Sequence, residues 1–182
     1  MAYSVLVLGE PEDLSLKSYS LKFAQGGEDH GDYDLVIDLR LGKIYFPATG
    51  TSIENPGIGL KQAVEEGIRT LSSEEYDPQL AMEMLAGSPE LFRNAQRLYA
   101  SEYGDLSERF EELFSRREFS EMRALAHKVK GYALYAGGKL LQKVAGILET
   151  ELKENKHGHY RHFLRLHERL LAQCQVENVQ EN

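Results

Sequence analysis

The sequence predicts a mainly α-helical protein: an antiparallel four-helix bundle preceded by a small α+β region that contains a β-hairpin. Two observations support this fold class. Apolar residues recur at helical spacing, with short loops between the helical segments, over most of the chain after residue 57. Before residue 57 they form short runs bounded by Gly-rich and acidic breaks, a pattern typical of strands. We therefore expect two regions of different architecture within the 182 residues.

The N-terminal region carries the strand signals. Its short apolar runs lie at residues 5–8, 21–23, 35–37 and 44–46. The segment 35–46 is expected to form a hairpin that turns at Gly42, and a helix is expected within 13–19. The stretch 47–59 (PATGTSIENPGIG) is rich in Gly, Pro, Ser and Thr and is interpreted as a loop or linker. Residues 1–56 are therefore predicted to be a small α+β region, to which the sequence assigns no role.

The helical part is expected to begin with a linker and helix over 57–74. Apolar residues there share one helical face: Leu60, Val64, Ile68 and Leu71. Asp77-Pro78 and Ser88-Pro89 each place an N-cap side chain before a proline in the first helical turn, which is a helix start signal. The bundle itself is predicted over 75–178.

Long amphipathic helices are expected within the bundle. The first starts at Pro89 as one long helix weakened by Gly104, and its predicted core face consists of Leu91, Ala95, Leu98, Leu106, Phe110, Leu113 and Phe114. The second spans 120–136 and ends at Gly137-Gly138, because glycine readily adopts the left-handed conformation that ends a helix. The third carries Leu141, Val144, Leu148 and Leu152. The last contains Cys174, the single cysteine of the chain, as a small core residue.

His127 is expected on the polar side of the helix over 120–136. The apolar stripe of that helix is predicted to be Met122, Leu125, Ala126, Val129, Tyr132, Ala133 and Ala136. At about 100° per residue, His127 and Gly131 point roughly 160° away from the centre of this stripe. Lys130 lies beside them, and Leu134 follows one turn further along. The periodicity therefore predicts an imidazole that is accessible to solvent.

These residue types suit phosphoryl transfer. A neutral imidazole nitrogen is a good phosphoryl acceptor near neutral pH. Lys130 can meet the phosphoryl oxygens as a compact cation, Gly131 leaves room for a partner, and Leu134 can add an apolar docking contact. A single surface histidine on a helix is more often only solvated, and a glycine within a helix can instead serve close helix packing. The geometry alone leaves these alternatives open.

The segment AHKVKGYALYAGGKLLQKVAGILE resembles the signature of histidine-containing phosphotransfer (HPt) domains. In that family the pattern H-x-x-K-G is followed by a glycine that closes the same helix. The next helix then carries a leucine near its start and a Leu-Glu pair further along. The matching positions here are His127, Lys130, Gly131, Gly137, Leu141, Leu148 and Glu149. The resemblance covers about residues 75–175, a little over half of the chain.

The resemblance implies a bundle that accepts a phosphoryl group on His127 from a receiver-domain aspartate and returns it to another. The implied partners are the receiver domains of hybrid histidine kinases and response regulators. By position, Lys130 would steady the phosphoryl group, and Gly131, Leu134 and Tyr135 would contact the receiver. The family usually has small residues after the Lys-Gly pair, so Tyr132 and Tyr135 are departures, and Tyr135 is expected to narrow the range of partners. Magnesium would belong to the receiver, and no cofactor is expected in this chain.

Composition and motifs argue against several other classes. The net charge of −8 and the absence of a basic stripe disfavour a nucleic-acid surface. No apolar segment approaches the length of a membrane span, and the N-terminal apolar run is too short for a signal peptide, so we expect a cytoplasmic protein. No kinase ATP-binding motif is present, so a phosphotransfer intermediate is expected rather than an enzyme.

Two further groups of residues suggest other functions. His157, His159, His162 and His167 invite a metal site, but without an obvious complete ligand shell ordinary loop and surface histidines are favoured. The run DYDLVIDLR resembles a receiver strand that ends in its acceptor, Asp38, yet the acidic pair expected after the first strand is missing and a strand-end acid is favoured.

The preferred hypothesis is an HPt phosphocarrier. A non-phosphorylated adaptor that binds receiver domains is the alternative, and a metal-dependent enzyme built on the C-terminal histidines is a third.

Overall fold

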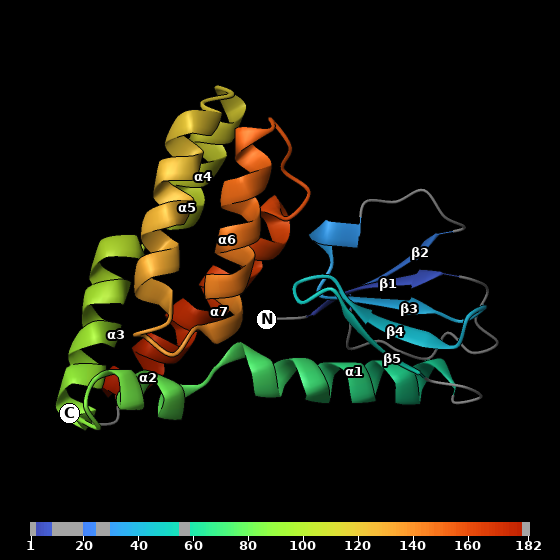
Figure 1. The fold of residues 1–182 in the computed structure, drawn as a ribbon, viewed down its shortest axis with the longest axis horizontal. Helices are drawn as coiled ribbons and strands as arrows, with labels where there is room; N and C mark the ends of the chain where they lie inside the picture. The colour runs from blue at the N-terminus through green and yellow to red at the C-terminus, as the bar shows by residue number, and fades with distance from the viewer. Residues whose placement is uncertain (1–2, 9–19, 25–29, 55–58, 180–182) are drawn as a thin grey trace. The chain divides into compact units, whose positions relative to one another are not determined.

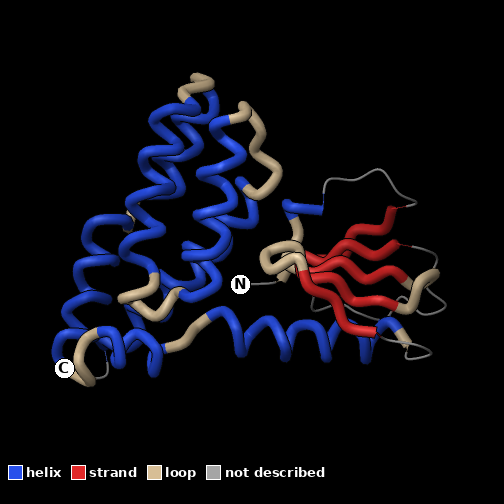
Figure 2. The backbone as a smooth tube through the Cα atoms, viewed as in Figure 1, coloured by secondary structure: helices blue, strands red, loops and turns tan. Residues whose placement is uncertain are grey.

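The computed structural model describes residues 3–8, 20–24, 30–54 and 59–179 (Figure 1). The chain divides into two compact units, Met1–Ser73 and Glu74–Asn182. Strands belong to the first unit, and the second is built from helices (Figure 2). The predicted fold class, a mainly α-helical bundle preceded by a small sheet region, is confirmed.

The N-terminal unit contains a mixed five-stranded sheet in the order β2-β1-β3-β4-β5. Its strands are β1 (Ser4–Leu8), β2 (Ser20–Ala24), β3 (Leu35–Asp38), β4 (Lys43–Phe46) and β5 (Thr51–Glu54), with a short 3-10 helix, η1 (His30–Asp32), before β3. Strand β1 pairs in parallel with β2 and β3, whereas β4 pairs antiparallel with β3 and β5. The hairpin expected over 35–46 is confirmed as β3 and β4, and Gly42 in its turn has a φ of +61°.

The expectation that residues 47–59 form only a loop is wrong for the segment 51–54, which is strand β5. A turn precedes the strand: the N–H groups of Thr49 and Gly50 both donate to the carbonyl of Phe46, and Gly50 has a φ of +67°. Ile53 then pairs with Ile44 of β4. The Gly and Pro residues lie just before and just after this short strand, so the whole stretch had the composition of a loop. The helix expected within 13–19 lies outside the described residues.

Helix α1 (Leu60–Glu75) covers one face of the sheet. A Cβ atom on Gly67 would lie 2.5 Å from Leu35 and 3.2 Å from Ile44, so the helix backbone passes directly over these two strands. Ala63, Val64 and other apolar residues of α1 are buried with it. Within the segment 57–74, predicted as a linker and helix, the described residues from Leu60 onward are therefore part of a packed helix, and those up to Ser73 belong to the N-terminal unit.

The C-terminal unit contains six helices among its described residues. They are α2 (Pro78–Met84), α3 (Pro89–Tyr103), α4 (Leu106–Ser115), α5 (Phe119–Ala133), α6 (Lys139–Lys153) and α7 (Tyr160–Val179). Both predicted helix starts are confirmed. Asp77 Oδ1 accepts from the N–H of Leu80 at 2.9 Å, and Ser88 Oγ accepts from the N–H of Leu91 at 3.2 Å.

The long helix predicted from Pro89 is two helices, α3 and α4, which meet at Gly104. Its predicted core face is wrong in α3: Leu91 and Leu98 are exposed, and Leu98 is 68% exposed. The buried residues of α3 are instead Phe92, Gln96, Tyr99 and Tyr103. Gln96 donates to the hydroxyl of Tyr76 at 2.9 Å, and the hydroxyl of Tyr99 lies 2.8 Å from Nδ1 of His167. These hydrogen bonds allow a partly polar face to be buried.

The core face predicted for the helix over 120–136 is confirmed at six residues, which are buried: Met122, Leu125, Ala126, Val129, Ala133 and Ala136. Tyr132 was placed in the core by its spacing, but it is 58% exposed and its ring lies against that of Tyr103. The helix ends at Ala133, and the turn that follows reaches Gly137 with a φ of +95°. Cys174 is buried as expected.

Candidate functional site: an oriented histidine on the bundle surface

Helix α5 presents His127 to solvent. Its neighbours Ala126 and Val129 are fully buried, so the helix is fixed against the bundle by the opposite face. The His127 side chain is 66% exposed. The exposure predicted from helical periodicity is therefore present.

Glu149 of α6 joins His127 to Lys130. Its Oε1 lies 3.2 Å from Nδ1 of His127, and its Oε2 accepts from Nζ of Lys130 at 2.9 Å. The side chain of Glu149 is largely buried, whereas that of Lys130 is partly exposed. One carboxylate thus holds the two residues that the H-x-x-K-G pattern brings together.

The charge of Glu149 decides which ring nitrogen of His127 carries the proton. The hydrogen bond from Lys130 lowers the pKa of Glu149, burial opposes this shift, and His127 adds to the lowering. An ionised carboxylate can only accept hydrogen bonds. In the neutral imidazole, Nδ1 must therefore carry the hydrogen that is donated to Glu149, which leaves the lone pair on Nε2.

Gly131 leaves open space beside the imidazole. A Cβ atom at this position would meet nothing within 4 Å, so no packing inside the protein requires a glycine there. A glycine in a helix interior costs about 1 kcal/mol relative to alanine. The second explanation considered for this glycine, close packing between helices, is therefore not supported.

The other two predicted docking residues follow at the end of α5. Tyr135 is exposed. Leu134 was expected to be exposed, but it is half-buried because it lies where α5 ends and the chain turns into α6. Leu134 therefore offers only part of its side chain to a partner.

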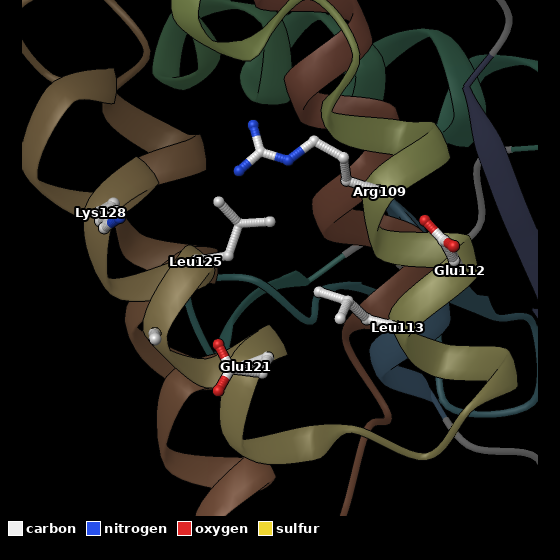
Figure 3. Close-up of a pocket in the computed structure, with 7 residues that line it drawn as sticks. Arg109, Glu112, Leu113, Glu121, Leu125 and Lys128 are labelled. Carbon is white, nitrogen blue, oxygen red and sulfur yellow. The ribbon is translucent and has the colours of Figure 1, made fainter.

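Two grooves border α5, and neither is lined by residues of α6. One, of about 310 Å³, lies between α4 and α5 and is lined by charged and apolar residues of both helices. Figure 3 shows Arg109 extending from α4 toward α5 above Leu125. The other groove, of about 420 Å³, lies between α3 and α5 and includes Leu98 and Tyr132. Lys128, the residue after His127, lines both grooves.

The C-terminal histidines do not form a metal centre among the described residues. His162 and His167 are buried, which corrects their interpretation as loop or surface residues. His159 is held by Glu151, whose Oε1 lies 2.7 Å from Nδ1. The side chain of Asp38, at the end of β3, accepts from the backbone of Arg40 and Leu41 and therefore closes its own turn.

Sequence reasoning gave no site role to Glu149 or Lys128. Glu149 is the glutamate of the Leu-Glu pair, a signal that marks its position without identifying its contact with the imidazole. Lys128 carried no signal in the sequence. None of the helices in the described part of the chain is long and apolar enough to cross a bilayer.

Helix α5 therefore presents an imidazole, held by the carboxylate of Glu149, on the surface of a helical bundle. The family model of the Hpt domain matches residues 85–180, just over half of the chain, and the chain belongs to this family. Hpt domains carry out histidine phosphotransfer in phosphorelays, as phosphocarriers that interact with receiver domains. Neither a curated protein nor a solved structure gave a significant match.

Proposed function

We propose that this chain is a phosphocarrier of a His–Asp phosphorelay in which His127 accepts a phosphoryl group from a receiver-domain aspartate and passes it to a response regulator. The bundle, predicted over 75–178, is the transfer module, and residues 1–56 form a separate region. Because receiver domains of such relays work in the cytoplasm, we place the chain there too. The observation that carries the proposal is the exposed His127 ring with Nδ1 directed at Glu149.

The proposed transfer uses the free lone pair of Nε2. This nitrogen attacks the phosphorus of the receiver's aspartyl phosphate, an N–P bond forms, and the P–O bond to the aspartate breaks. The aspartate leaves as a carboxylate. The phosphorylated ring keeps its Nδ1–H and becomes cationic, and the negative charge of Glu149 stabilises that cation. A cationic ring is also a good leaving group when the next aspartate attacks the phosphorus.

Lys130 is proposed to meet the phosphoryl oxygens. Its ammonium group has three N–H donors, and the bond to Glu149 uses one of them. Its partly exposed side chain leaves the remaining donors accessible. Lys130 would therefore offset the phosphoryl charge without releasing Glu149.

Transfer from charged receivers tests the proposal. Receiver domains of the source organism are labelled with radioactive acetyl phosphate and mixed with the wild type, with His127→Gln and with His157→Gln, a control at another exposed histidine. We expect acid-labile label on the wild type and on the control, and none on His127→Gln. Receiver binding that is retained in His127→Gln, with no label on any variant, would instead identify the non-phosphorylated adaptor.

A further inference from the structure

The α3 helix has an exposed apolar side that the bundle does not use. Leu98 is 68% exposed, and across the groove Tyr132 of α5 is 58% exposed. The Tyr132 ring centroid lies 5.9 Å from that of Tyr103, which holds the ring beside α3. Exposed apolar side chains that face each other across a groove indicate a binding surface more strongly than isolated ones.

This apolar pair is continuous with the helix that carries His127. The groove between the pair has a volume of about 420 Å³ and includes Lys128, the neighbour of His127, and Glu102 of α3. Among the described residues, the Lys128 side chain has no ion pair or hydrogen bond. One wall of the groove is thus the phosphoacceptor helix itself, and it carries an uncommitted positive charge.

A protein domain that docks at His127 is large enough to cover this groove as well. A specific interface covers about 800 Å² on each partner, equivalent to a disc roughly 30 Å across. Packed helices are about 8–10 Å apart. A domain that brings its aspartyl phosphate to His127 therefore also covers part of the neighbouring helix. Helix α3 contributes Leu98 at that position, whereas on the other side α6 contributes the charged Glu149.

We infer that Leu98 and Tyr132 form an apolar clamp that selects the receiver partner, with an apolar side chain of the receiver between them and an acidic one beside Lys128. The inference rests on the proposed phosphotransfer and adds its specificity determinant. Tyr132 presents a bulky, exposed ring at one side of the groove. The clamp would therefore favour receivers whose surface accommodates a tyrosine ring and exclude others by steric conflict.

The test measures transfer from acetyl-phosphate-charged receivers of the source organism to the wild type, Leu98→Ala and Tyr132→Ala. Leu41→Ala is the matched control, because Leu41 is 66% exposed but belongs to the N-terminal unit. Direct labelling of His127 by phosphoramidate, which needs no docking, runs in parallel. We expect each clamp variant to raise KM for the preferred receiver about tenfold, with kcat and phosphoramidate labelling unchanged.

The outcomes separate the two claims. If no receiver labels the wild type, the proposed function itself fails. If the wild type is labelled and the clamp variants have the KM of Leu41→Ala, phosphotransfer stands and the clamp is overturned. Sedimentation of the same variants tests self-association. If the wild type dimerises while the clamp variants do not, and if transfer is unaffected, the patch binds a second copy of the chain. That result would also overturn the inference.

Discussion

Nδ1 of His127 on α5 lies 3.2 Å from Oε1 of Glu149 on α6, a contact between residues that are 22 positions apart. It makes the carboxylate a positioning residue for the imidazole. The same carboxylate binds Lys130, so the ring and the cation share one anchor. The predictions below follow from this arrangement and from the packing behind it.

Glu149→Gln should slow phosphorylation of His127 without unfolding the bundle. The amide has no charge to stabilise the cationic ring, and it no longer requires Nδ1 to be the donor. We expect labelling by phosphoramidate to slow about tenfold, which corresponds to ~1.4 kcal/mol. The ¹⁵N spectrum of the ring should also show less of the tautomer protonated at Nδ1.

Glu151→Gln provides the matched control for that experiment. Glu151 is on the same helix and also holds a histidine ring, that of His159. It should leave both the labelling rate and the His127 tautomer unchanged. An unaltered tautomer in Glu149→Gln would show that the carboxylate does not orient the ring.

Substitution of Gly131 should separate stability from transfer. Since a Cβ atom would meet nothing within 4 Å, Gly131→Ala should raise the free energy of unfolding by up to about 1 kcal/mol. Transfer from a receiver should fall in Gly131→Ala and fall further in Gly131→Leu, because the partner loses its room. Denaturant unfolding and receiver transfer measure the two effects, and full transfer in Gly131→Leu would contradict the docking role.

Stability should decrease between pH 7 and pH 5 because of His167. Burial lowers the pKa of His167 from 6.5 to about 4, with a hydrogen bond to the Tyr103 backbone opposing the shift. In this window the unfolded chain binds a proton that the folded chain does not, so stability is fully present above pH 6.5 and falls as the pH decreases toward 4. The expected loss between pH 7 and pH 5 is about 2 kcal/mol.

Denaturant midpoints at the two pH values measure this loss. His167→Gln should reduce the pH dependence, although it weakens the bundle at both values because the bond with Tyr99 is altered. The carboxylates with lowered pKa, such as Glu149, contribute their own pH dependence mainly below about pH 5, at the lower end of this window. An equal slope in the wild type and in His167→Gln would contradict the assignment.

Local features of the fold were predictable from the sequence. The N-cap bonds of Asp77 and Ser88 each connect residues three positions apart, so their sequence signal is complete within one turn. The exposure of His127 followed from the spacing of apolar residues along one helix. Such features depend only on residues that are close together in the sequence.

Long-range contacts were not predictable in this way. The buried face of α3 was mispredicted because Tyr99 is paired with His167, 68 positions away. By hydropathy alone, Leu98 is a stronger candidate for a buried core position than Tyr99. The contact of Glu149 with the imidazole likewise depends on how α5 and α6 pack, and the position of the glutamate in a motif did not specify it.

The site of phosphorylation on the ring tests the central claim most directly. Protein labelled with ¹⁵N-histidine is phosphorylated by a charged receiver, and the ³¹P–¹⁵N couplings identify the nitrogen that carries phosphorus. We expect a single phosphohistidine, at Nε2 of His127, because Nδ1 is occupied by its contact with Glu149. Phosphorus on Nδ1, or on any residue other than His127, would contradict it.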